Sequence, residues 1–167
     1  TLQEYVGAGL SQFGQMKPAM LNTLLSVMMY KKFYPSEEDG LSMDEYFQKK
    51  ANNLTRPTLG LETVQDQIDV LFGSQSIERQ AESLLCTIKN IDYGKKQIDK
   101  LMTAYYAQDL TAMAKLYEEE DSDNPCPSTQ EEKDELNKER NQLWMEKLPE
   151  MMSNKPSFIA VGCLHFV

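Results

Sequence analysis

Apolar residues recur every three or four positions along most of this chain, in stretches separated by short runs rich in proline, glycine or serine. That spacing is typical of amphipathic α-helices. Together with the stop and cap residues between the stretches, it predicts about eight helices. They are expected over residues 2–13, 16–32, 42–52, 62–72, 76–88, 93–107, 110–118 and 129–154.

Several helix boundaries carry specific signals. Ser42 followed by Glu45 matches the capping box, in which each side chain accepts a hydrogen bond from the other residue's backbone. Pro18 suits the first turn of a helix, where its missing N–H costs nothing. Pro149 falls late in the last predicted helix, so we expect it to kink that helix or end it early.

Two short stretches favour β structure. Residues 158–161 form an apolar run of β-branched and aromatic residues after Lys155-Pro156, which predicts a strand buried on both faces near 157–164. Residues 55–61 also lean towards β structure but contain Pro57 and Gly60. The expected fold is therefore mainly α within an α/β (α+β) fold, with two short β segments.

Length and charge narrow the class of protein. The 167 residues suit a single domain over 1–167 with its own core. A net charge of −9 and the lack of a basic stripe argue against nucleic-acid binding. No apolar run approaches the length of a membrane span. The acidic residues 118–129, with two prolines among them, are expected to form a mobile loop.

The three cysteines, Cys86, Cys126 and Cys163, have no Cys-x-x-Cys spacing. They predict neither a disulfide framework nor a structural zinc site. Cys126 lies between two prolines in the acidic loop. It is expected to be either an exposed free thiol or a partner in an isolated bridge.

His165 is the only histidine in the chain, and it follows the predicted buried strand. Gly162, three residues earlier, allows the backbone to turn or a ligand to approach closely. Because α/β folds place their chemistry at strand ends, His165 is a candidate site residue. Judged alone, a single histidine is more often a hydrogen-bonded structural residue than a ligand.

Three motifs occur together in a fixed order. They are Gly60-Leu-Glu-Thr followed by Gln67, then Arg140-Asn141, and then the run from Pro156 through Gly162 to His165. The last resembles the second Gly-x-x-His motif of the TraB/GumN family, which includes the Tiki metalloproteases. The other two are similar to that family's Gly-Leu-Glu-Thr segment and Arg-Asn signature.

Two weaker matches support the resemblance, which covers nearly the whole chain. Lys17-Pro18 resembles a family helix start, and residues 105–110 resemble an aromatic followed by Gly-Asp-Leu, with Gln108 where glycine is usual. The family's first Gly-x-x-His motif has no counterpart here, since the chain has one histidine. We therefore expect an incomplete TraB/GumN-like domain.

The resemblance implies a peptidase-like, metal-dependent hydrolase with manganese, cobalt or zinc. His165 would be a metal ligand. Glu62 would be a carboxylate at the site or a charge placed at a helix start. Arg140 would hold an anionic intermediate, orient a carboxylate or pair with glutamates of its own helix. Asn141 would satisfy a backbone group at a strand end.

The ligand count bears on activity. A catalytic metal site takes about three protein ligands, and the sequence offers His165 and, less strongly, Glu62. We therefore expect this stretch to be inactive by itself. The resemblance also implies a peptide or protein substrate and an exported, periplasmic or membrane-associated parent protein.

The alternative function is a non-catalytic helical binding module of the same fold that recognises a peptide or another partner. Its surface would be rich in methionine and aromatic residues, although the same residues are also typical of a core. The residues concerned are Met20, Met28, Met29, Tyr30, Phe33 and Tyr34.

Overall fold

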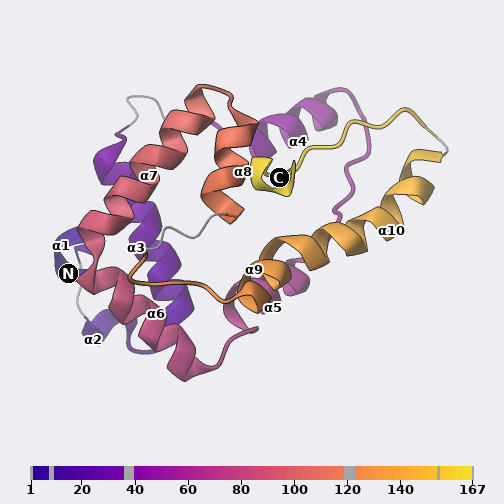
Figure 1. Cartoon of the computed structure of the whole chain (residues 1–167). Helices are drawn as coiled ribbons and strands as arrows, with labels where there is room; N and C mark the ends of the chain where they lie inside the picture. The colour runs from indigo at the N-terminus through magenta and orange to yellow at the C-terminus, as the bar shows by residue number, and fades with distance from the viewer. Residues whose placement is uncertain (1, 8–9, 36–39, 119–122, 154, 167) are drawn as a thin grey trace.

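The structure, a computed structural model, describes residues 2–7, 10–35, 40–118, 123–153 and 155–166. Within these ranges the chain is helical, and no residue belongs to a β-strand (Figure 1). The helices are α1 (Leu2–Val6), α2 (Leu10–Phe13), α3 (Pro18–Phe33), α4 (Met43–Asn53), α5 (Val64–Phe72), α6 (Ile77–Lys89), α7 (Ile91–Tyr106), α8 (Leu110–Glu118), α9 (Gln130–Lys133), the π-helix η1 (Asp134–Lys138), α10 (Glu139–Ser153) and the 3-10 helix η2 (Cys163–Phe166).

The expected α/β fold with two short β segments is wrong for the described residues. Residues 55–61 and 155–162 are both without regular hydrogen-bonded structure. Phe158 is 74% exposed, so the second stretch is not a strand buried on both faces. Strand propensity describes how well a residue fits a pleated, half-buried surface, and no described segment provides such a surface beside either stretch.

Two predicted helix-start signals, the capping box at Ser42 and the first-turn proline at Pro18, are confirmed. The backbone N–H of Glu45 donates to Ser42 Oγ at 3.2 Å, and the Ser42 N–H donates to Glu45 Oε2 at 3.1 Å. Pro18 occupies the first turn of α3. Asp109 accepts the N–H of Ala112 at 2.9 Å at the start of α8. Each signal acts within three residues of its partner, which is why the sequence shows it.

The last predicted helix is continuous but not uniform. It begins after Thr129, which caps α9, and passes through the π-helix η1 before α10. Pro149 lies inside α10 and does not end it early, since the helix continues to Ser153. Single π-helical turns within α-helices are rare and occur frequently at functional sites.

The core lies between α3 and α6. Leu21, Leu25 and Met29 recur every fourth residue on α3, and all three are buried together with Leu84 of α6. Figure 1 shows α3, α6 and α7 packed at one side, whereas α9, η1 and α10 lead away from them. The chain then returns from the end of α10 and reaches η2, which contacts α8.

The six residues of the hypothetical binding surface do not form one exposed patch. Met29 is 2% exposed and belongs to the core, and Phe33 packs against that core. Met28 and Tyr34 are half-buried. Only Met20 and Tyr30 are exposed, at 37% and 39%.

A disulfide joins Cys86 of α6 to Cys126, 40 residues further along the chain. Of the two states expected for Cys126, the bridge is therefore the one observed, and Cys163 remains a free thiol. The bridge holds the segment before α9 against α6. Within the predicted acidic loop, residues 119–122 lie outside the described residues, and the predicted mobility stays a prediction.

Candidate functional site

One face of the last helix carries four side chains that reach other parts of the chain. Asn137 of η1 and Arg140, Asn141 and Trp144 of α10 are spaced three or four residues apart, so they share a face. Asn137 and Trp144 are buried, with exposed fractions of 6% and 7%. Together they contact Glu62 and the C-terminal residues of η2.

Arg140 makes a two-pronged ion pair with Glu62. Its Nε donates to Oε1 at 2.7 Å and its Nη2 donates to Oε2 at 2.8 Å. The two side chains are only 17% and 9% exposed. The expected pairing of Arg140 with glutamates of its own helix is therefore wrong, because its carboxylate partner comes from 78 residues earlier.

The ion pair determines the charge of Glu62. Hydrogen bonds from Arg140 lower the pKa of the Glu62 carboxyl, although burial opposes this shift. Glu62 precedes Thr63, the residue that caps α5, so its carboxylate serves Arg140 and not the helix end. Since both oxygens accept from the guanidinium, Glu62 is a weak base with its charge already balanced.

Asn141 holds His165 through two hydrogen bonds. Its Nδ2 donates to the His165 carbonyl oxygen at 3.2 Å, and its Oδ1 lies 2.8 Å from His165 Nδ1. Because the amide N–H₂ faces the carbonyl, the amide oxygen faces the ring and accepts a hydrogen bond from Nδ1–H. The neutral imidazole then has its lone pair on Nε2. No described residue hydrogen-bonds to Nε2.

Trp144 lies between the histidine and the ion pair. Its ring centroid is 4.3 Å from that of His165, and the Arg140 guanidinium carbon lies 5.2 Å from its centroid. Burial first, and then the positive charge of Arg140, lower the pKa of His165, with Glu62 opposing them. The neutral ring is therefore the favoured form at neutral pH.

Two buried polar atoms in this cluster lack a hydrogen-bond partner among the described residues: Trp144 Nε1 and Asn137 Oδ1. The indole N–H lies close enough to the Glu62 carboxylate to help lower its pKa. It does not reach an acceptor with hydrogen-bond geometry. Asn137 uses its other amide group to donate to the Leu164 carbonyl oxygen at 2.7 Å.

The motif glycine, Gly162, is not required by this arrangement. A Cβ atom added there would lie 3.7 Å from His165 Cδ2, which is ordinary van der Waals contact. Its backbone φ is outside the left-handed region that favours glycine.

The sequence-predicted site residues therefore lie together, in two linked pairs. Glu62 with Arg140 and Asn141 with His165 are joined through the Trp144 ring. The roles of Asn137 and Trp144 were missed by sequence reasoning. The spacing of both residues relative to Arg140 and Asn141, on one helical face, was the signal that could have found them.

These residues do not amount to a metal centre. Among the residues that the structure describes, no three histidine, cysteine, aspartate or glutamate side chains come together as a ligand group. Both oxygens of Glu62 accept hydrogen bonds from Arg140, which leaves one lone pair on each and makes Glu62 a weaker donor to a metal. Its expected role as a carboxylate at the site stays a prediction. His165 Nε2 is the one donor with the chemistry of a ligand in the cluster.

The described residues form a helical domain. In it, Asn141 of α10 orients the ring of His165. The chain belongs to the TraB/PrgY/gumN family, whose family model matches residues 1–167. The resemblance drawn from the sequence motifs is thereby confirmed. No curated protein and no solved structure matches the chain. No helix among the described residues combines the length and apolar character needed to cross a bilayer.

Proposed function

We propose that this protein belongs to the divalent-metal-dependent, peptidase-like hydrolases, that His165 is a metal ligand, and that residues 1–167 are inactive by themselves. The observation that carries the proposal is the imidazole held at Nδ1 by Asn141, with Nε2 without a described hydrogen-bond partner. Metal-ligating histidines almost always donate their other ring N–H to a protein or water acceptor, which fixes the tautomer. The lowered pKa of His165 supports the same neutral form.

Asn141 and Arg140 act through other residues in this proposal. Asn141 orients the ring of His165 and selects its tautomer. Arg140 balances the charge of Glu62 and places a guanidinium against the Trp144 face, which disfavours a proton on His165. These two and Glu62 are therefore positioning residues, whereas His165 offers the atom that would bind.

The donor set limits the proposal. The described residues supply one ligand, while a catalytic site takes about three. They therefore account for one ligand and not for a complete coordination sphere, so no chemical step is assigned to a metal. The imidazole donor suits manganese, cobalt or zinc.

The test is a calorimetric titration of the purified protein with Mn²⁺, Co²⁺ and Zn²⁺. We expect binding that His165→Ala abolishes and that Asn141→Ala weakens by about 10- to 100-fold. Asn52→Ala, at an exposed position of α4, is the matched control and should bind as the unsubstituted protein does.

Hydrolysis is measured on the same samples with an unfolded protein substrate such as casein. We expect metal binding without cleavage, since one ligand does not complete a catalytic site. A protein that binds none of the three ions at millimolar concentration, or one whose binding is unchanged by His165→Ala, contradicts the proposal.

Exposed apolar side chains favour a second candidate, a non-catalytic module that binds a peptide or another partner. Leu59, Val64 and Phe158 are 73%, 75% and 74% exposed. Large apolar side chains exposed to solvent are candidates for contact with a partner. Casein that binds equally well to the His165→Ala variant and in the presence of a chelator, without being cleaved, would favour this candidate.

A further inference from the structure

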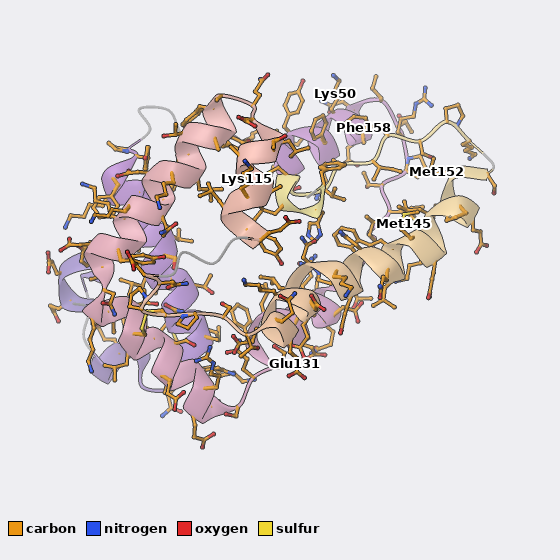
Figure 2. All side chains as sticks on the ribbon, in the orientation of Figure 1. Lys50, Lys115, Glu131, Met145, Met152 and Phe158 are labelled. Carbon is orange, nitrogen blue, oxygen red and sulfur yellow. A yellow bond between two sulfur atoms is a disulfide. The ribbon has the colours of Figure 1, made fainter. Side chains whose placement is uncertain are left out.

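Two asparagines, four residues apart on one helical face, hold two successive carbonyl groups of η2. Asn137 Nδ2 donates to the Leu164 carbonyl oxygen at 2.7 Å, and Asn141 Nδ2 donates to the His165 carbonyl oxygen at 3.2 Å. The last carbonyl groups of a helix lack partners within it, so donors from outside can satisfy them. η2 contacts both α8 and η1, the element that carries Asn137 (Figure 2). Both peptide groups that flank the α-carbon of His165 are therefore held from one helix.

The two hydrogen bonds are unequal. N–H···O distances in proteins range from about 2.7 to 3.2 Å, so the Asn137 bond lies at the short end of this range and the Asn141 bond at the long end. Asn137 is only 6% exposed, and a hydrogen bond shielded from water is electrostatically stronger. Asn141 also uses its amide oxygen for the imidazole ring. The backbone of His165 is thus held chiefly by Asn137, whereas Asn141 acts on the ring.

The Asn137 side chain is poorly suited to a purely structural role. Its Oδ1 atom is buried and has no hydrogen-bond partner among the described residues. A buried polar atom without a partner destabilises the folded chain, and leucine would fill a similar space without that cost. Asn137 also belongs to the π-helix η1, and such turns occur frequently at functional sites. Asparagine is explained at this position if its N–H₂ group is needed at the Leu164 carbonyl.

We propose that Asn137 is a positioning residue for His165, acting through the Leu164 carbonyl. By fixing the backbone of η2, it keeps His165 Nδ1 within 2.8 Å of Asn141 Oδ1, and Nε2 is left to a metal ion. A displacement of about 1 Å would take Nδ1 out of hydrogen-bond range. The inference rests on the proposed function only in its last step, the binding of a metal at Nε2.

The ring nitrogens of His165 report the effect without a metal. His165 is the only histidine, so the nitrogen NMR spectrum of the isotope-labelled protein has one pair of imidazole signals. At about pH 8, above the ordinary pKa of histidine, these signals should show a proton on Nδ1 and none on Nε2. Asn137→Leu removes the N–H₂ donor and fills the space. The two signals should then move towards each other, because a loosened ring exchanges between its neutral tautomers. Unchanged signals overturn the proposal.

Gln80→Ala is the matched control for the loss of a buried amide. Gln80 of α6 is 2% exposed, and its Nε2 donates to the carbonyl oxygens of Phe72 and Gln75. This substitution should lower Tm and leave the ring signals of the histidine in place. Equal movement of those signals in both variants would indicate a general loosening of the fold and overturn the proposal. If Asn137→Leu does not fold, Asn137→Ala, which is too small to clash, is measured in its place.

Metal titration gives a second result and separates this inference from the proposed function. Residues that orient a metal-bound histidine typically contribute about 10- to 100-fold to affinity. Asn137→Leu should therefore weaken the binding of Mn²⁺, Co²⁺ or Zn²⁺ by about ten-fold or more, and Gln80→Ala should leave it unchanged. Unchanged affinity in Asn137→Leu overturns the inference. If the unsubstituted protein binds none of the ions, the hydrolase proposal fails and the ring signals alone decide the role of Asn137.

Discussion

The side chain of Asn141 makes two hydrogen bonds to His165, one to its backbone carbonyl and one to its ring. The bond to the carbonyl determines which atom of the amide faces the ring. Its amide N–H₂ donates to the His165 carbonyl, and its amide oxygen therefore accepts from the ring. Beside this pair, Arg140 and Glu62 cancel each other's charge with little access to solvent. Removing Glu62 tests how much this ion pair contributes to stability.

Glu62→Ala leaves the Arg140 guanidinium partly buried without its partner. Removing one member of a buried pair costs about 3 kcal/mol of unfolding free energy, measured by urea denaturation. Lys138→Ala is the control, because the Lys138 side chain is 65% exposed and its partner Asp134 is 28% exposed. That change should cost less than about 0.5 kcal/mol. Equal, small losses for both variants would contradict a structural role for the Glu62–Arg140 pair.

At the scale of elements, two covalent features constrain the segments around the candidate site. The disulfide fixes the segment before α9 to α6, next to a second ion pair in which Arg79 Nε donates to Glu132 Oε1 at 2.7 Å. Pro149 interrupts the hydrogen-bond pattern of α10, the helix that carries Arg140 and Asn141. Both features can be tested by their effect on stability.

Cys126→Ser removes the bridge across a 40-residue separation. Loop-closure entropy and the stability of native disulfides both predict a loss of about 2–4 kcal/mol of unfolding free energy. Thermal denaturation should show the same fall in Tm for the protein treated with a reductant. Cys163→Ser, at the free thiol, should change Tm little, and an equal fall in both variants would refute the assignment.

Pro149→Ala restores a backbone N–H in the interior of α10. Because proline inside a helix is strongly unfavourable, we expect a gain of about 1–3 kcal/mol of unfolding free energy. Pro18→Ala is the control, since Pro18 lies in the first turn of α3, where no hydrogen bond is lost. Stabilisation by both substitutions, or by neither, would count against this explanation.

At the scale of the whole molecule, the lowered pKa values of several groups all make the folded chain less stable at low pH. Hydrogen bonds from arginine lower the pKa of Glu62 and of Glu132, burial chiefly lowers that of His165, and hydrogen bonds lower those of Asp66 and Asp134. In each case the unfolded chain binds protons more readily than the folded chain. The contribution of these groups to the free energy of unfolding is therefore complete above their unfolded pKa values, and it is lost as the pH falls through their folded pKa values.

We predict a decline in two stages when the urea midpoint is measured from about pH 8 towards about pH 3, a range that includes the ordinary pKa values of histidine and the carboxylates. The first begins as the pH falls below about 6.5, where unfolded histidine gains a proton and His165 does not. The second and larger begins near 4.5, where unfolded glutamate is protonated. His165→Phe should remove the first stage only, and a midpoint that rises below pH 6.5 would contradict the prediction.

The sequence by itself determined most of the succession of helices, the cap at Ser42, the family, and the candidate residues Glu62, Arg140, Asn141 and His165. Helix signals act between residues three or four positions apart, so they can be read from the chain. The family motifs likewise depend on residue identity and order.

Only the tertiary structure decided how those residues are bonded. The Arg140–Glu62 pair spans 78 residues and the disulfide spans 40, and neither has a local signature. The two predicted β segments failed because a strand requires a neighbouring strand, and no described residues supply one beside them. The apolar, β-branched composition around residue 158 led to a wrong prediction of a strand, because such a propensity is realised only where a neighbouring strand is available, and the segment's own sequence does not show that.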